Sequence, residues 1–122
     1  MGYGINMTNS DGTPCMVHSD NVGGGIIRLY EGKTPNMVEA ETSITYNYGK
    51  YYYDTIDKKD GIRWIYGKTG DEVKDKLLEA ISTSGTKFSG DYWEDTPGNA
   101  GVMLEMLFKW CVENPKGIFR GD

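Results

Sequence analysis

The stretch "TPGNAGVMLEMLFKWCVENP", residues 96–115, predicts the helix on which the rest of the fold depends. Thr96 is a favourable N-cap, and Pro97 suits the first helical position because its φ is preset and its missing N–H would be unpaired there anyway. The residue before a proline avoids the α region, so Asn114-Pro115 is expected to end the helix. Apolar side chains leave it almost no polar face: Ala100, Val102, Met103, Leu104, Met106, Leu107, Phe108, Trp110, Cys111 and Val112. A sheet and a second helix must therefore cover it on most sides.

A capping box at Thr69–Glu72 predicts the start of that second helix. In such a box the Thr hydroxyl and the Glu carboxylate each pair with a backbone N–H that would otherwise lack a partner. Gly85 is expected to end the helix, because glycine readily adopts the left-handed conformation of a C-terminal stop. The predicted buried face carries Val73, Leu77, Leu78 and Ile81, and the face turned to water carries Asp71, Lys74, Asp75 and Lys76.

The same helix start overlaps a sequence that resembles a phosphate-binding P-loop. The segment "GIRWIYGKTG", residues 61–70, ends in Gly-Lys-Thr. A P-loop has four residues between its first glycine and the Gly-Lys pair. Here five residues separate Gly61 from Gly67, and they include an arginine, a tryptophan and a tyrosine. Such bulky side chains would obstruct the nest of backbone N–H groups that holds phosphate, so Lys68 is assigned to the helix start and not to a nucleotide.

The first half of the chain has the pattern of strands. "GYGINMT" and "PCMVH" are separated by a segment containing Asp11-Gly12, a dipeptide typical of tight hairpins, so a β-hairpin is predicted. "IIRLYE", residues 26–31, continues the strand pattern. In "MVEAETSITYNY", residues 37–48, alternation predicts one strand whose core face carries Val38, Ala40, Thr42, Ile44, Tyr46 and Tyr48.

Two short elements complete the prediction. A helix of about two turns is expected in "GKYYYDTIDKKDG", with Asp60-Gly61 as its exit. "GIFR", residues 117–120, predicts a short final strand. The fold expected is therefore a single α+β domain, residues 1–122, with an N-terminal antiparallel sheet that includes a hairpin, followed by two main C-terminal helices packed on the sheet.

Charge limits the classes of partner. Eighteen acidic against thirteen basic side chains give a net charge of −5, and the basic residues form no cluster. Because an acidic protein repels phosphates, we expect no nucleic-acid partner, whereas the same balance suits a basic protein. No stretch of about 18 apolar residues predicts a membrane span, and no signal-peptide pattern is present. We expect a protein of the bacterial cytoplasm with no membrane partner, and the oligomeric state stays open.

Few residues offer reactive chemistry. Cys15 and Cys111 are expected to be free thiols, since one His18 and no C-x-x-C pair do not make a zinc site. A Cys15 nucleophile beside His18 and Asp20 would need a lowered thiol pKa, which this acidic stretch does not favour. Carboxylate clusters fall at predicted helix starts, where the helix dipole favours negative charge: Asp71, Glu72 and Asp75, and Asp91, Glu94 and Asp95. No catalytic residue, metal or cofactor is predicted.

One polar and aromatic set has the composition of a binding site. Its members are Thr45, Asn47, Tyr92, Trp93, Gly98 and Asn99. Threonine and asparagine side chains can read the edge of a ligand, and aromatic rings can stack on it. Free N–H groups at a helix start attract an anion. We expect the set to form a pocket for an anionic, ring-containing ligand, where the "ITYNY" strand meets the long helix.

Residues 44–119 carry a resemblance to a family. The order Ile-Thr-Tyr-Asn-Tyr, Gly-Ile-Arg, Gly-Lys-Thr-Gly and Tyr-Trp-x-x-Thr-x-Gly-Asn-Ala resembles a family of small, largely uncharacterised proteins of bacteriophages, prophages and bacteria. The resemblance carries no settled activity. We expect a non-catalytic phage-type binding protein that captures a nucleotide-like small molecule or a host protein, and the company of this family implies a role in counter-defence. Two alternatives stay open: a small metal-dependent enzyme acting on a nucleotide or nucleic acid, and a structural component of a virion.

Overall fold

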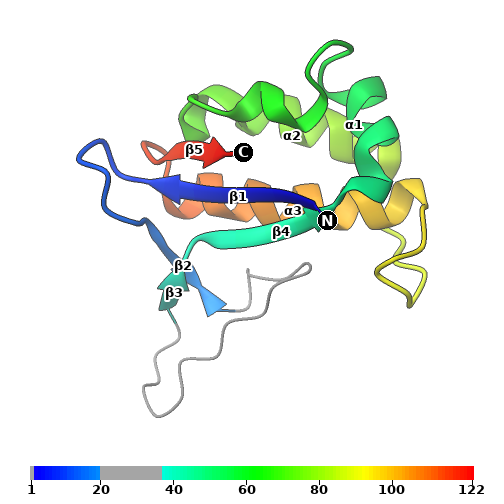
Figure 1. Cartoon of the computed structure of the whole chain (residues 1–122), viewed down its shortest axis with the longest axis horizontal. Coiled ribbons are helices and arrows are strands. Elements are labelled where there is room, and N and C mark those ends of the chain that lie inside the picture. Colours follow the sequence, from blue (N-terminus) through cyan, green and yellow to red (C-terminus); the bar gives the residue numbers. More distant parts are fainter. Residues whose placement is uncertain (1, 20–36) are drawn as a thin grey trace.

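The computed structural model describes residues 2–19 and 37–122, which form an α+β fold as predicted (Figure 1). Strands lie mainly in the first half and helices in the second. In chain order the elements are β1 (Gly2–Thr8), β2 (Met16–His18), β3 (Met37–Glu39), β4 (Glu41–Thr45), the 3₁₀ turn η2 (Tyr46–Tyr48), α1 (Gly49–Thr55), the 3₁₀ turn η3 (Gly61–Ile65), α2 (Gly70–Ser84), α3 (Pro97–Glu113) and β5 (Ile118–Gly121).

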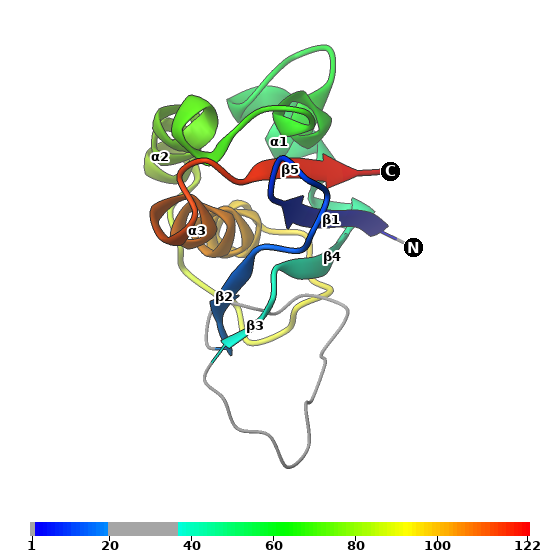
Figure 2. The same ribbon diagram turned by 90° about the vertical axis from the view of Figure 1, so that its left-hand side faces the viewer.

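The main sheet is antiparallel and has the order β4-β1-β5. Ile5, in the central strand, lies opposite Thr42 of β4 on one side and Gly121 of β5 on the other. Burial alternates along β1, so that Tyr3, Ile5 and Met7 face the helices. Figure 2 shows the two layers that result, with α2 and α3 side by side against one face of the strands.

The long helix α3 begins and ends as predicted. The Thr96 hydroxyl accepts a hydrogen bond from the backbone N–H of Asn99 at 3.1 Å, and Pro97 occupies the first helical position. Leu104, Leu107 and Trp110 are fully buried, because the sheet and α2 cover most of the helix. Val112 is 63% exposed, so the cover is not complete at the C-terminal end.

Helix α2 confirms the capping box and corrects the predicted face. The Thr69 hydroxyl accepts the Glu72 N–H at 3.3 Å, and the Glu72 carboxylate accepts the Thr69 N–H at 2.9 Å. Gly85 ends the helix with φ 74°. The buried residues of the apolar stripe are Val73, Leu77 and Ala80, whereas Leu78 is exposed. Leu78 follows Leu77 directly, and one residue rotates the side chain by about 100° out of the stripe.

The single strand predicted over residues 37–48 is wrong. The chain forms β3 and β4 in two different sheets, and β4 ends at Thr45. The Thr45 hydroxyl accepts the Asn47 N–H at 3.2 Å, which starts the turn η2 in place of further strand. As a result Thr45 is buried and Tyr46 is 42% exposed, the reverse of the alternation, although Tyr48 is buried as expected.

The N-terminal hairpin is confirmed at its loop. A bridge joins Thr8 to Pro14, the Asn9 N–H donates to the Thr13 carbonyl oxygen at 2.7 Å, and Gly12 has φ 90°. Beyond the loop β2 leaves β1 and pairs with β3 in a separate two-stranded sheet. The predicted strand "IIRLYE" lies outside the described residues, as does Asp20.

The segment that contains Gly-Lys-Thr makes structural contacts with Trp64 and with β5. The Lys68 ammonium donates to the Trp64 carbonyl oxygen at 2.7 Å and lies 4.3 Å from the centre of the Trp64 ring. The Gly67 N–H donates to the Phe119 carbonyl oxygen, and the Phe119 N–H donates to the Lys68 carbonyl oxygen. This segment therefore closes the outer edge of β5. The predicted short helix and final strand are both present, as α1 and β5.

Candidate functional site

The six candidate residues lie around the loop 86–96, which joins α2 to α3. Tyr92 of this loop closes the outer edge of β4. Its hydroxyl accepts the Thr45 N–H at 2.7 Å and donates to the Ser43 carbonyl oxygen at 3.1 Å. Unpaired N–H and C=O groups at a sheet edge invite another strand, and Tyr92 occupies two of them. Thr45 and Tyr92 thus bond directly to each other, whereas both were expected to line a ligand pocket.

Asn99 organises the interior of the loop. Its side chain is almost fully buried, and its Oδ1 accepts the Ser89 N–H at 2.8 Å. Its Nδ2 lies 3.0 Å from the Ser89 hydroxyl, 2.9 Å from the Asp91 carbonyl oxygen and 3.0 Å from the Glu94 carbonyl oxygen. The hydrogen-bonding capacity of this amide is therefore used within the protein.

Gly98 lets the same loop lie directly on the start of α3. A Cβ atom at Gly98 would overlap the carbonyl oxygen of Lys87, so only glycine permits this approach. Gly98 is buried beneath the loop. The helix start that was expected to receive an anion is therefore covered by backbone.

The loop is also fastened to η2 and α1. Asn47 donates its side-chain N–H to the Trp93 carbonyl oxygen at 3.0 Å, and the Tyr48 hydroxyl donates to the Tyr92 carbonyl oxygen. The Tyr51 hydroxyl donates to the Asp95 carbonyl oxygen at 3.2 Å. Lys50 and Asp95 also form an ion pair of 2.8 Å. The loop backbone is thus held from residue 89 to residue 96.

Protonation states support these contacts. The ammonium of Lys50, which donates to the Asp95 carboxylate, lowers the pKa of that carboxyl. Burial raises the pKa of Tyr48 to about 12 and also raises the pKa of Tyr92. Both hydroxyls therefore keep their protons at neutral pH and continue to donate hydrogen bonds.

In contrast to its fixed backbone, the loop exposes two large apolar side chains. Trp93 is 57% exposed and Phe88 is 50% exposed. The Trp93 ring packs edge-on against Tyr92, with 4.9 Å between ring centres. Isolated exposed apolar residues are ordinary on protein surfaces. Here, however, the backbone that carries the exposed tryptophan is held by side chains of η2, α1 and α3.

The cysteine and histidine candidates stay apart from this loop. Cys15 is buried, its thiol donates to Asn9 Oδ1 at 3.5 Å, and burial raises its pKa. Burial raises the pKa of Cys111 to about 12. His18 is exposed, and its backbone N–H donates to a Glu113 carboxylate oxygen at 3.0 Å. Within residues 2–19 and 37–122, no group of three His, Cys, Asp or Glu side chains is placed to hold a metal ion.

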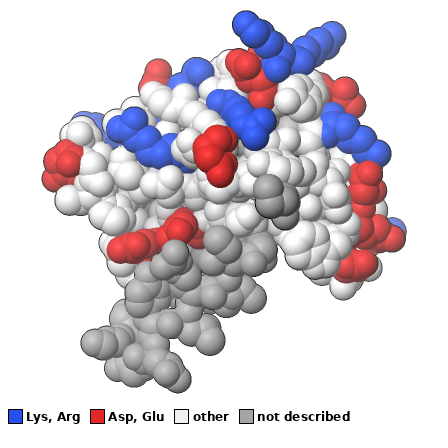
Figure 3. Space-filling view, viewed as in Figure 1, with Lys and Arg blue, Asp and Glu red and all other residues white. Residues whose placement is uncertain are grey.

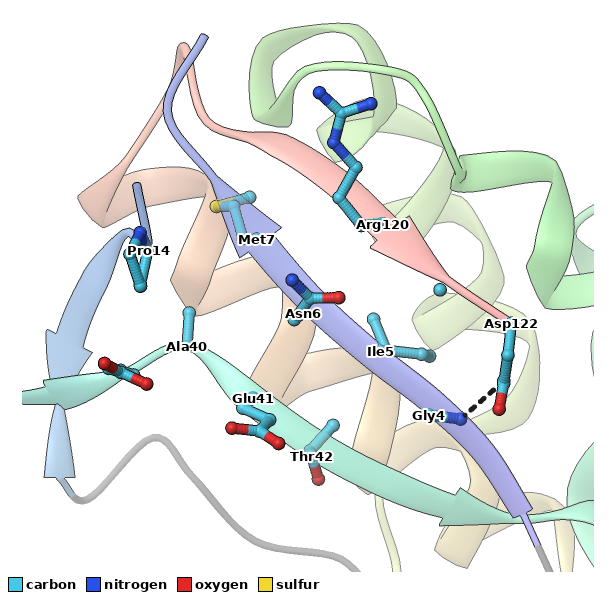
Figure 4. A pocket seen from close by; sticks show the side chains of 12 residues that line it. Gly4, Ile5, Asn6, Met7, Pro14, Ala40, Glu41, Thr42, Arg120 and Asp122 are labelled. Carbon is cyan, nitrogen blue, oxygen red and sulfur yellow. Dashed lines mark hydrogen bonds between the residues drawn. The ribbon is translucent and has the colours of Figure 1, made fainter. Parts of the chain in front are cut away.

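Sequence reasoning missed a hollow of about 480 Å³ on the face of the sheet that lies away from the helices (Figure 4). The sequence feature that could have indicated it is the series of small or polar residues at alternate positions of β1. Their side chains are too small to fill that face of the sheet. The Asp122 carboxylate accepts the Gly4 N–H at 3.0 Å at one end, and Arg120 Nε donates to the Thr8 hydroxyl at 3.3 Å. The polar residues lining the hollow include Asn6, Glu39, Glu41, Thr42, Arg120 and Asp122.

Comparison with known protein families, curated proteins and solved structures finds no match to this chain. Among the described helices, none has the length and apolar character needed to cross a lipid bilayer.

Proposed function

We propose that the chain is a non-catalytic binding protein that captures a protein partner through the loop 86–96. The observation that supports this most directly is the 57% exposure of Trp93 on a loop whose backbone accepts hydrogen bonds from the buried side chains of Tyr48 and Asn99. Tryptophan is enriched among the residues that contribute most to protein interfaces. A fixed loop loses little conformational entropy on binding, which favours affinity.

The alternative of a nucleotide-like small molecule is less well supported at this site. The Asn99 amide and the Tyr92 hydroxyl already have partners inside the protein, and Lys87 covers the helix start at Gly98. A small ligand at this site would need to displace those contacts. The resemblance to phage and prophage proteins would make the captured partner a protein of the bacterial host, with counter-defence as the biological role.

Site-specific photocrosslinking tests the proposal. A benzophenone amino acid is introduced at Phe88, which is 50% exposed on the same loop and leaves Trp93 in place, and, as the matched control, at Leu78, which is 45% exposed on α2. We expect the probe at position 88, expressed in the bacterial host, to crosslink one discrete protein that the probe at position 78 does not.

Affinity for that purified partner then decides the outcome. By calorimetry Trp93→Ala should weaken binding at least tenfold, as loss of a central tryptophan typically does, while Leu78→Ala leaves it unchanged. Equal affinity of the two variants would reject the loop as the binding element. Micromolar binding of a cyclic nucleotide or ADP-ribose derivative that is lost in Asn47→Ala would instead establish the small-ligand alternative.

A further inference from the structure

The exposed tryptophan lies in a turn that also carries two acidic residues. Residues 91–94 form a tight turn, in which the Glu94 N–H donates to the Asp91 carbonyl oxygen at 3.0 Å. The Trp93 N–H donates to the Asp91 carboxylate, also at 3.0 Å. Asp91, Trp93 and Glu94 are all exposed, so one turn presents two acidic residues and a tryptophan to solvent.

Among the described residues, no Lys or Arg forms an ion pair with Asp91 or Glu94. Lys50 forms its ion pair with Asp95, at 2.8 Å. Figure 3 shows acidic side chains gathered along the edge of the molecule at which α1 and this loop lie. The protein as a whole carries a net charge of −5, which adds to the local field.

We infer that the turn 91–94 binds a cationic side chain, an arginine or a lysine, presented by a basic segment of the partner protein. This inference rests on the proposed function and specifies the chemistry of the partner. The face of an indole ring attracts a cation, and carboxylates beside the ring add an ion pair. Charge complementarity also speeds association and excludes acidic partners, among them nucleic acid and anionic lipid surfaces.

Short peptides test the inference without the natural partner. The ¹⁵N-labelled protein has three tryptophan indole N–H signals, and that of Trp93 is assigned by its loss in Trp93→Phe. The probe is an acetylated, amidated Gly-Arg-Gly-Arg-Gly peptide. The control is the same peptide with citrulline, which keeps the shape of arginine but lacks its charge.

The arginine peptide should shift the Trp93 signal saturably, with an affinity roughly three- to tenfold above that of the citrulline peptide. Raising the salt concentration should weaken binding of the arginine peptide but not binding of the citrulline peptide. Glu94→Gln should remove most of the difference in affinity between the arginine and citrulline peptides. Glu79→Gln, an equal change of charge at an exposed position of α2, should not.

Equal shifts with both peptides, or none with either, would overturn the inference. The proposed function would survive that result if a crosslinked partner still depends on Trp93, because apolar contact would then be the basis of recognition. Failure of the crosslinking experiment, in contrast, would reject the proposed function whatever the peptides do.

Discussion

The side-chain amide of Asn99 connects the start of α3 to three residues of the loop 86–96, namely Ser89, Asp91 and Glu94. Asn47 makes a single side-chain hydrogen bond to the same loop and is exposed. Removal of the Asn99 side chain should therefore lower the free energy of unfolding more than removal of the Asn47 side chain. A buried amide that is deleted leaves several backbone groups without partners, whereas an exposed amide is replaced by water.

Asn99→Ala should lower the free energy of unfolding by about 2–4 kcal/mol, because several buried groups lose their partners together. Asn47→Ala should lower it by no more than about 1 kcal/mol. Urea denaturation of both variants, followed by circular dichroism, gives the comparison. If the two variants were equally stable, the hydrogen bonds of Asn99 would not be what holds the loop.

At the scale of elements, glycine sets the distance between α2 and α3 at both ends. A Cβ atom at Gly101, near the start of α3, would overlap the carbonyl oxygen of Gly85 at the end of α2. At the opposite end, a Cβ atom at Gly70 would come within 2.8 Å of the Asn114 carbonyl oxygen. The two antiparallel helices can therefore approach closely along their whole length.

Gly101→Ala is expected to destabilise the protein by about 1–3 kcal/mol, the usual cost of overpacking. This result is opposite to helix propensity, which favours alanine over glycine by about 1 kcal/mol. Ser82→Ala, at an exposed position of α2, provides the control and should change stability by no more than about 0.5 kcal/mol. Thermal melts suffice, and a stabilised Gly101→Ala variant would show that the helices can separate without cost.

At the scale of the whole molecule, tyrosines link the layers. Tyr52 of α1 is fully buried and donates to the Ala100 carbonyl oxygen in α3 at 3.0 Å. Burial raises its pKa well above the usual value, and it raises the pKa of Tyr48 and of Tyr66 to about 12. In the unfolded chain the same groups titrate near pH 10. Their contribution to stability is therefore complete below about pH 10 and is lost as pH rises toward 12.

The free energy of unfolding should accordingly be insensitive to these tyrosines between pH 7 and 9. Above about pH 10 it should fall, with each such tyrosine adding up to about 1.4 kcal/mol per pH unit to the slope. Tyr48→Phe removes one of these groups and should flatten the slope by that amount. Urea melts of both proteins from pH 8 to 11 measure it, and parallel curves would contradict the assignment to Tyr48.

Sequence reasoning reached the elements that local signals define. The capping box at Thr69, the Thr96-Pro97 start and the Gly85 stop each act within one turn of helix, so they were readable without the fold. The predictions that failed concern features that depend on contacts between distant parts of the chain. Nothing local showed that β3 and β4 join different sheets. The candidate binding set did meet in space, but burial and hydrogen bonding, which depend on the whole fold, turned most of its polar groups inward.

The position of β1 at the centre of the sheet has a consequence for synthesis on the ribosome. The central strand β1 is synthesised well before one of its neighbours, β5, which comprises residues 118–121. At about 5–20 residues per second, β1 waits several seconds with one edge unpaired. During that time the nascent chain presents a strand edge that other chains can join. We expect pairing between nascent chains at this edge to be a route by which the protein aggregates.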